Sequence, residues 1–444
     1  MPALPRFAVG AVQPYADALP MLWALGEVCE RRGYHIQNYL SRSCLVARHG
    51  GTPHATSARH LDSWLMCPEV CREIFVHGSR ACDLAIVEGQ FDAARDALDG
   101  GGGSLDQLCD WLDLPRVVVL DVACLDACRL PERPQADALL LDRVGGSEEF
   151  ARLQTRLESL WGIPVVGGLE RLDECRAAIR RLASGEVPPR RLTRSLGDSL
   201  ARGLRLEKLL SLATHRPFPP VTANRLSTGQ RLAEVSIAVA YDEIFNCYFP
   251  DSLDLLELQG ANVSTFSPLH DESIPDGTDV VYLGCGHPEN ADGRLGANHS
   301  MRTSLCEHMI SGGRVYAEGG GLAYLCESIE LPDGRDVAMM GLLPAIARLR
   351  ADVPPPGPVE VTLSQGNWLG EGWSQLRGYL NRRWEVLPTG HLTRYAAEEG
   401  HELDLVGTAQ TVGSRIHLNF AAQPEFLKAF FAPHPPSVAL SALS

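Results

Sequence analysis

Long apolar runs are missing from this 444-residue sequence: none approaches the roughly 18 residues of a membrane-spanning helix, so we expect no membrane association. Basic residues are in the minority, with 40 lysines and arginines against 55 aspartates and glutamates and a formal net charge of −15. Non-specific nucleic-acid binding needs clustered cations, so this balance argues against it. The first residues, Met1–Phe7, are too short and too interrupted by proline for a secretion signal.

No Cys-x-x-Cys spacing occurs, although the chain has 13 cysteines. An odd number without a secretion signal favours reduced thiols and a cytoplasmic location over a disulfide framework. Two pairs, Cys67/Cys71 and Cys124/Cys128, are each four residues apart and would share a helical face if their segments are helical. Such pairs could hold a metal or a metal tetrapyrrole. The alternative is that they are small buried residues of the core.

The length is too great for one hydrophobic core, so we expect two domains and a linker. Apolar content of 45% and charged content of 21% are typical of a globular protein. In the N-terminal half, apolar strands alternate with helices, which predicts a parallel, doubly wound α/β sheet. The predicted strands are Arg6–Val12, Tyr34–Tyr39, Asp83–Glu88, Arg116–Asp121, Ala138–Leu141 and Ile163–Val166, and the predicted helices are Leu19–Arg32, Glu148–Trp161 and Leu172–Leu182.

A glycine cluster stands out in the C-terminal half, where the apolar run at Arg314–Tyr316 leads through Glu318 into Gly319–Gly321. A strand that breaks into glycines and then into a helix has the shape of a nucleophile elbow, the turn that presents an attacking side chain. Its tip here is Gly319, which has no side chain. Glycine accepts the strained backbone of such a turn without a steric penalty. The sequence therefore predicts an active-site architecture without its nucleophile.

Further segments accompany the elbow in a fixed order. They are Ile237–Asp242, Phe266–Leu269, Tyr282–Glu289, Ala297–Asn298 and Ser300–Arg302. Together these motifs resemble the glutaminase domain of cobyrinate a,c-diamide synthases, and the resemblance extends over nearly the whole chain. It implies two doubly wound domains: a P-loop-type parallel sheet and a class I glutamine amidotransferase-like domain. Members of this family amidate carboxylates of a corrin precursor, or of sirohaem-type tetrapyrroles in related branches, with glutamine and ATP.

The resemblance also assigns roles to single positions. In the family the elbow reads Ala-Glu-Cys-Gly-Gly, and its cysteine attacks glutamine. Here Glu318 is kept and Gly319 takes the cysteine position, while His417 matches one of two family histidines and Asn419 replaces the other. These three positions are thus vestigial, and the resemblance implies no catalytic residue in this chain. The alternative for His417, which we favour, is a half-buried histidine of a strand with no role in chemistry. Cys285 could substitute as the nucleophile, but it lacks a helix terminus to stabilise a thiolate.

The family's nucleotide-binding loop ends in Gly-Lys-Thr-Thr, and its counterpart here is degenerate. The matching positions are Pro14, Tyr15, Asp17, Ala18 and Leu19, with Ala18 in place of the lysine and Leu19 in place of the threonine. Prolines remove amide donors, and Asp17 would repel phosphate. We therefore expect no cofactor, and in particular neither ATP nor Mg, although a bound tetrapyrrole is compatible with the sequence.

Two acidic residues resemble the family's metal ligands, Glu88 in Val-Glu-Gly and Asp121 at the end of a strand. They would bind magnesium in an active enzyme. The alternative, which we favour, is that they cap helices or pair with arginines. Asp62 and Trp64 lie in a segment, Leu61–Trp64, that matches the family and could contact a ligand; Trp64 is otherwise a core residue.

Arginines cluster in the proline-rich region 185–232, which we predict to be a linker with a short helix at Leu204–Leu212. Arg190 and Arg191 are candidates for gripping tetrapyrrole carboxylates, because a guanidinium binds an acid in a bidentate way. The alternative is a solvated linker. The predicted parts are 1–184, a degenerate ATP-dependent amidoligase-like domain, the linker 185–232, the amidotransferase-like domain 233–434 and a tail 435–444.

Three functions remain open from the sequence. The first is a non-catalytic member of this family that binds a tetrapyrrole or corrin-like acid, or an intact paralogous subunit. The second is active glutamine- or ammonia-dependent amidation of cobyrinate or sirohaem-type carboxylates. The third is a purely structural interaction protein. A homodimer is compatible with all three.

Overall fold

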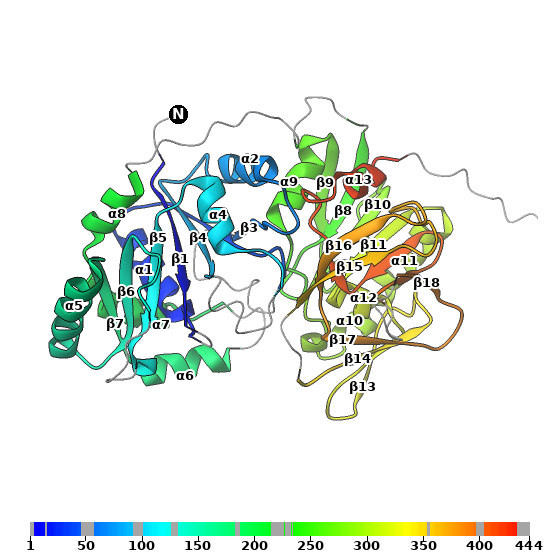
Figure 1. Ribbon diagram of the computed structural model, residues 1–444. Coiled ribbons are helices and arrows are strands. Elements are labelled where there is room, and N and C mark those ends of the chain that lie inside the picture. The colour runs from blue at the N-terminus through cyan, green and yellow to red at the C-terminus, as the bar shows by residue number, and fades with distance from the viewer. Residues whose placement is uncertain are drawn as a thin grey trace, which may run out of the picture. The chain divides into compact units, whose positions relative to one another are not determined.

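The computed structural model describes residues 4–13, 16–45, 57–91, 101–125, 132–182, 187–214, 226, 232, 234–352, 356–396 and 404–432. The chain forms two compact units, whose elements are drawn in Figure 1. Unit 1 comprises Met1–Ser43 and Arg48–Arg225, and unit 2 comprises Cys44–Ala47 and Leu226–Ser444. A short segment from the N-terminal part of the chain therefore belongs to unit 2.

Unit 1 is built on a parallel seven-stranded sheet in the order β3-β2-β4-β1-β5-β6-β7 (Figure 1). Parallel neighbours need crossover connections, which explains the alternation of strands and helices in the sequence. The predicted doubly wound fold is confirmed. The strands are β1 (Arg6–Ala11), β2 (Ile36–Leu40), β3 (Arg59–His60), β4 (Leu84–Gln90), β5 (Arg116–Asp121), β6 (Ala138–Val144) and β7 (Val165–Glu170).

Helices bury one face of this sheet in a shared core. Alternate residues of β1, Phe7 and Val9, lie in one apolar cluster with Leu25 and with Leu196. This follows from the period of two in a strand, which turns Phe7 and Val9 to the same side. The helices of unit 1 are α1 (Leu19–Arg31), α2 (Pro68–Gly78), α4 (Leu105–Leu112), α5 (Ser147–Trp161), α6 (Asp173–Arg181), α7 (Arg190–Ala201) and α8 (Leu206–Thr214), with a 3-10 turn η1 at Val122–Cys124.

The region predicted as a linker differs in the structure. It contains α8, near the expected short helix, and also α7, which the sequence did not predict. Helix α7 packs against α1, and its Leu192, Leu196 and Leu200 are buried in the core of unit 1. Two of the prolines that suggested a linker, Pro188 and Pro189, stand just before α7, a position where proline costs no hydrogen bond.

Unit 2 holds a second seven-stranded sheet in the order β18-β19-β20-β11-β10-β8-β9. Five of its strands pair in parallel with one another. They are β8 (Val235–Ala240), β9 (Ala261–Phe266), β10 (Val280–Leu283), β11 (Arg314–Glu318) and β20 (Thr411–Ser414). Two antiparallel strands, β18 (Thr393–Ala396) and β19 (Leu405–Gly407), form one edge of the sheet. A mixed sheet of this kind is common in α/β domains.

Smaller elements complete unit 2. A four-stranded sheet contains β12 (Ser328–Glu330), β13 (Asp336–Ala338), β14 (Ala345–Leu349) and β17 (Trp384–Pro388), and a three-stranded sheet contains β15 (Gly357–Thr362), β16 (Gln375–Leu380) and β21 (Ile416–His417). The helices are α9 (Pro250–Leu258), α10 (Arg294–Ala297), α11 (His299–Ile310), α12 (Gly320–Leu325) and α13 (Pro424–Ala429), with a 3-10 turn η2 at Pro288–Ala291. Across the described part of both units, no helix has the length and apolarity needed to cross a membrane.

The assignment of α7 to the core of unit 1 predicts a mutational effect. Leu196→Ala removes a fully buried side chain and should lower the free energy of unfolding by about 2–5 kcal/mol. The exposed Arg191→Ala on the same helix is the matched control and should change it by less than about 0.5 kcal/mol. Urea denaturation followed by circular dichroism measures both. Equal, negligible effects would show that α7 is a peripheral linker.

Candidate functional site

The elbow of unit 2 is formed as expected between β11 and α12, with Gly319 at its tip. Gly319 has φ 51° and ψ −108°, a backbone region that other residues enter only under strain of about 1–3 kcal/mol. The Gly319 amide donates to the Ser414 carbonyl at 2.9 Å, and the Ala323 amide donates to the Gly319 carbonyl at 3.1 Å. Backbone hydrogen bonds therefore hold the turn without any contribution from a side chain at its tip.

The glycines after the tip allow a close backbone approach. A Cβ added to Gly320 would lie 2.2 Å from the Gly286 carbonyl oxygen, and one added to Gly321 would lie 2.4 Å from the Leu283 carbonyl oxygen. Real Cβ atoms do not come this near to a carbonyl, so the elbow requires glycine at both positions. The turn that follows β10 is thus packed directly against the start of α12.

A thiol fills the space beside the empty tip. The Cys285 Sγ lies 3.0 Å from where a Cβ on Gly319 would stand. Cys285 belongs to a buried apolar cluster with Leu45, Cys247 and Phe249. Burial raises the pKa of the Cys285 thiol well above its ordinary value, and the neighbouring Glu318 and Cys247 raise it further. Since the thiolate is the nucleophilic form, this environment suppresses the nucleophilicity of Cys285.

His417, which matches a family histidine and which we expected to be half-buried in a strand, is fully buried on β21, and its ring nitrogens have polar neighbours. Its Nδ1 accepts a hydrogen bond of 2.9 Å from the backbone amide of Leu45, and its Nε2 lies 3.2 Å from the Asn381 Nδ2. Because its lone pair is used, Nδ1 is not available to take a proton from a thiol.

The cavity at the elbow is small. Its volume is about 30 Å³, room for one or two water molecules. Three of the buried polar atoms near it have no hydrogen-bond partner among the described residues: His287 Nε2, Glu289 Oε2 and Arg383 Nε. The cavity is lined by Leu45, Cys247, Cys285, Gly286, His287, Gly320, Asn381, Arg383 and Trp384.

Glu318, the last residue of β11, is a buried carboxyl behind the elbow. Its Oε1 accepts hydrogen bonds from the Tyr316 hydroxyl and, at 3.1 Å, from the Leu418 amide. Its Oε2 has no partner among the described residues. Burial raises the pKa of Glu318 to about 7, although both hydrogen bonds oppose this shift. The carboxyl therefore holds its backbone neighbours and carries a proton at mildly acidic pH.

This raised pKa predicts a pH-dependent stability. Between an unfolded pKa of 4.5 and a folded pKa of about 7, the folded state binds a proton that the unfolded state releases. Stability from this group is complete below pH 4.5 and falls as pH rises towards 7, by at most about 3 kcal/mol. Glu318→Gln should flatten the stability–pH curve over this range.

Urea denaturation at pH 5, 6, 7 and 8 measures that curve. The control is the exposed Glu327→Gln, which should keep the wild-type slope. A wild-type slope in Glu318→Gln would mean that another group carries the pH dependence.

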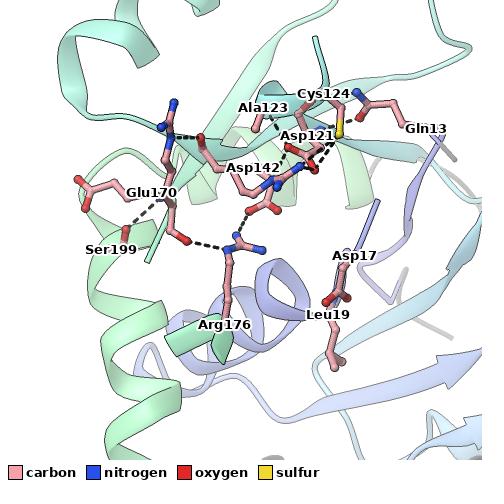
Figure 2. A network of polar contacts seen from close by, with 12 residues as sticks. Gln13, Asp17, Leu19, Asp121, Ala123, Cys124, Asp142, Glu170, Arg176 and Ser199 are labelled. Carbon is pink, nitrogen blue, oxygen red and sulfur yellow. Dashed lines mark hydrogen bonds and ion pairs between the residues drawn. The ribbon is translucent and has the colours of Figure 1, made fainter. Parts of the chain in front are cut away.

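In unit 1, the candidate nucleotide site lies where parallel α/β sheets bind ligands, at the carboxyl ends of strands whose connections run in opposite directions. In this sheet those strands are β1 and β5. Gln13, just after β1, bridges them by hydrogen bonds to the backbone of Asp121: Gln13 Nε2 donates to the carbonyl at 3.0 Å, and the Asp121 amide donates to Gln13 Oε1 at 2.7 Å (Figure 2). Gln13 therefore ties the end of β1 to the end of β5.

The carboxylate of Asp121 is also hydrogen-bonded within the protein (Figure 2). Its carboxylate accepts from the Ala123 amide at 3.0 Å and caps the 3-10 turn η1. It also receives both Nε, at 2.7 Å, and Nη2 of Arg143. Arg143 adopts φ 58°, a strained backbone that brings its guanidinium to this carboxylate. The structure thus gives Asp121 the helix-capping and arginine-pairing roles favoured from the sequence.

The structure does not bring the other metal candidates together. Glu88 lies within β4 rather than at its end. Cys67 is the extended residue before α2 and Cys71 lies buried inside that helix, while Cys128 lies outside the described residues. In the described ranges, no three His, Cys, Asp or Glu side chains form a group that could hold a metal ion.

Two further acids beside this site serve the fold. Asp17 accepts a hydrogen bond of 3.1 Å from the Leu19 amide and so occupies a free donor at the start of α1 (Figure 2). Asp142 pairs with Arg176 at 2.5 Å, and burial raises its pKa to about 6. Ala18 stands just before α1, and the remaining expected loop residues, Pro14 and Tyr15, lie outside the described residues.

The Asp121–Arg143 pair predicts a second stability effect. Arg143→Ala leaves a carboxylate that is 6% exposed without its guanidinium partner, and should cost about 2–3 kcal/mol after allowance for the partly exposed arginine. Urea denaturation measures the loss. Asp121→Asn combined with Arg143→Ala should recover part of it, because no buried charge remains. A double variant that loses as much as the sum of both single variants would contradict a direct pair.

The predicted ligand residues fall in different settings. Asp62 is fully buried and accepts from the amides of Ser43, Trp64 and Leu65 at 2.9, 2.9 and 3.0 Å, so it shapes the backbone. Trp64 is half-buried and lines a cavity of about 440 Å³ in unit 1 that also contains the carboxylates of Asp106 and Asp110. Arg190 and Arg191 are exposed in the first turn of α7.

Residues 236–424 match the family model of the CobB/CobQ-like glutamine amidotransferase domain. The cobyrinate a,c-diamide synthase of Dehalococcoides mccartyi is 26% identical over 96% of this chain and 97% of its own. That of Syntrophotalea carbinolica is 28% identical over 96% of this chain and 98% of its own. The chain is a homologue of the cobyrinate a,c-diamide synthases. A crystal structure of a glutamine amidotransferase matches 44% of the chain and 99% of its own length, at 15% identity and a TM-score of 0.34.

Several residues of these homologous sites could not be found from the sequence. Leu45, Gln13 and Arg143 each act through a backbone or side chain far away along the chain, at His417 and Asp121. No spacing pattern in the local sequence indicates such long-range contacts.

Proposed function

We propose that this homologue of the cobyrinate a,c-diamide synthases acts by binding, without glutaminase or ATP chemistry. The observation that carries the proposal is the elbow, where Gly319 holds the strained turn and offers no attacking atom. A hydrolytic attack on glutamine needs a thiolate and a base at hydrogen-bond distance. Neither is available at Gly319, and the nearest thiol, Cys285, is kept protonated by burial.

The small size of the cavity supports this proposal. A volume of about 30 Å³ cannot admit a glutamine side chain together with its α-amino and α-carboxyl groups. Leu45 lines that cavity, and its amide occupies the Nδ1 lone pair of His417. Glutamine would have to displace Leu45 and would then find no nucleophile.

The strand ends of unit 1 give similar support. A triphosphate with magnesium needs open amide donors and free carboxylates at this edge. Gln13 bridges β1 to β5, Asp17 occupies an amide at the start of α1, and Arg143 neutralises Asp121. We infer that these internal contacts replace a bound nucleotide.

The ligand class follows from the relatives, whose name gives cobyrinate, a polycarboxylate, as the compound that they act on. Exposed guanidinium groups suit such an acid, and Arg190 and Arg191 present two side by side in sequence at the start of α7. The cavity beside Trp64 suits it less, because two carboxylates line it, those of Asp106 and Asp110, which share the single guanidinium of Arg116. We therefore infer a tetrapyrrole or corrin-like acid at the arginines.

The test uses the purified full-length chain and three measurements. Glutamate release from glutamine and phosphate release from ATP should both stay at background, with and without cobyrinic acid. Cobyrinic acid should bind, seen as a shift of its absorption spectrum and by equilibrium dialysis. Arg190→Ala combined with Arg191→Ala should weaken this binding at least about tenfold, a difference of 1.4 kcal/mol. Arg180→Ala, an exposed arginine on α6, is the matched control.

Other outcomes of these measurements would favour one of the alternative functions. ATP-dependent amidation of the acid would establish an active enzyme and overturn the non-catalytic proposal. Glutamine hydrolysis that Cys285→Ser abolishes and Cys306→Ser preserves would assign Cys285 as its nucleophile. Absence of any binding, with the chain folded, would overturn the tetrapyrrole proposal and favour a structural interaction protein.

A further inference from the structure

Helix α7 has two faces of opposite character, a buried face of leucines and an exposed face of arginines. The exposed side chains Arg190, Arg191 and Arg194 make up what we call the arginine face. Within the part of the chain that the structure describes, none of these three guanidinium groups has an ion pair or a hydrogen bond. Their donors are therefore open to a ligand.

Two carboxylates lie beside the arginine face, and both already have a cationic partner. The Nη1 of Arg31 lies 2.5 Å from the Oδ1 of Asp198, and its Nε lies 2.7 Å from the Oε1 of Glu27. The same guanidinium donates from Nη2 to the Arg194 carbonyl at 3.4 Å, which places it next to this face. The arginine face thus keeps a surplus of positive charge in a chain whose formal net charge is −15.

The spacing of the arginines decides which of them can act together. An α-helix has 3.6 residues per turn, so Arg190 and Arg194 lie on the same side, with Cβ atoms about 5–6 Å apart. Arg191 lies about 100° further around the helix. Like charges four residues apart destabilise a helix, and an anion that contacts both guanidinium groups would relieve this repulsion. Arg190 and Arg194 therefore suit a ligand with neighbouring carboxylates.

We propose that Arg190 and Arg194 together bind two carboxylates of one ligand, with Arg191 as a third contact, so that α7 selects polycarboxylates over their amides and esters. The identity of that ligand as a tetrapyrrole acid rests on the function proposed above. A guanidinium binds a carboxylate through two parallel charge-assisted hydrogen bonds, which an uncharged amide or ester cannot reproduce. Such a ligand is bound as the free acid and is held less tightly after each amidation.

The first test compares ligands on the full-length chain by equilibrium dialysis. Cobyrinic acid and benzene hexacarboxylate should both bind, whereas the heptamethyl ester of cobyrinic acid and benzoate should bind at least about tenfold more weakly. Added sodium chloride should weaken the binding of both polyacids, because salt screens exposed charges. If the ester bound as tightly as the acid, contacts with the ring would hold the ligand and the proposal would be wrong.

The second test assigns the residues. Arg190→Ala and Arg194→Ala should each weaken the binding of both polyacids about three- to tenfold. Arg194→Lys should recover part of the loss, because it restores the charge without the planar fork. Arg156→Ala, which removes an exposed arginine of α5, is the matched control and should leave binding unchanged. Urea denaturation checks that all four variants keep the wild-type stability.

The outcomes separate this inference from the proposed function. Cobyrinic acid binding that Arg194→Ala leaves unchanged would overturn the role of Arg194 and leave the proposed ligand in place. Hexacarboxylate binding that needs Arg194, without any binding of cobyrinic acid, would support polycarboxylate selection by α7 and overturn the tetrapyrrole proposal. Absence of binding of either polyacid would overturn both.

Discussion

The left-handed backbone at Gly319 is the constraint on which the site in unit 2 depends. It turns the chain sharply from β11 into α12 and presses Gly320 and Gly321 against carbonyl groups of the turn after β10. Any larger residue at those two positions would force the two segments apart. The neighbouring thiol, the buried Glu318 and the engaged His417 are all arranged around this one turn. The elbow thus persists as a packing device, whatever chemistry its position supports.

A common physical feature unites the carboxyl ends of the strands in both units. Polar groups that would face a ligand in an open α/β site are bonded within the protein: Asp121 to Arg143 and Gln13 in unit 1, and His417 to Leu45 in unit 2. A buried polar atom costs free energy unless it is paired. These internal partners therefore offset the cost of burying the polar groups concerned. Three buried polar atoms without a partner among the described residues, His287 Nε2, Glu289 Oε2 and Arg383 Nε, lie near the small cavity at the elbow.

Strands with continuous apolar runs were the part of the fold that sequence reasoning located best. Arg116–Asp121 coincides with β5, and Arg6–Val12 differs from β1 by one residue, because buried parallel strands leave a run that no other element explains. Helix α7 was missed because its arginines and the preceding prolines resemble a linker, while only its three leucines reveal the buried face. At the candidate site, the positions of Gly319 and Glu318 in the elbow could be predicted from the local sequence pattern. Leu45 did not, since its partner His417 is 372 residues away along the chain.

The place of Leu45 has a consequence for how the chain can be divided. Its neighbours Ser43 and Arg48 belong to unit 1, whereas Leu45 itself is counted among the residues of unit 2. A fragment starting at Leu226 would carry every strand of the second sheet and still miss one buried leucine and one amide donor. His417 would then face water or a void, and the apolar floor formed by Cys247, Phe249 and Cys285 would be uncovered. A fragment of the second half would thus lack Leu45, a residue from the first half of the sequence that belongs to the interior of unit 2.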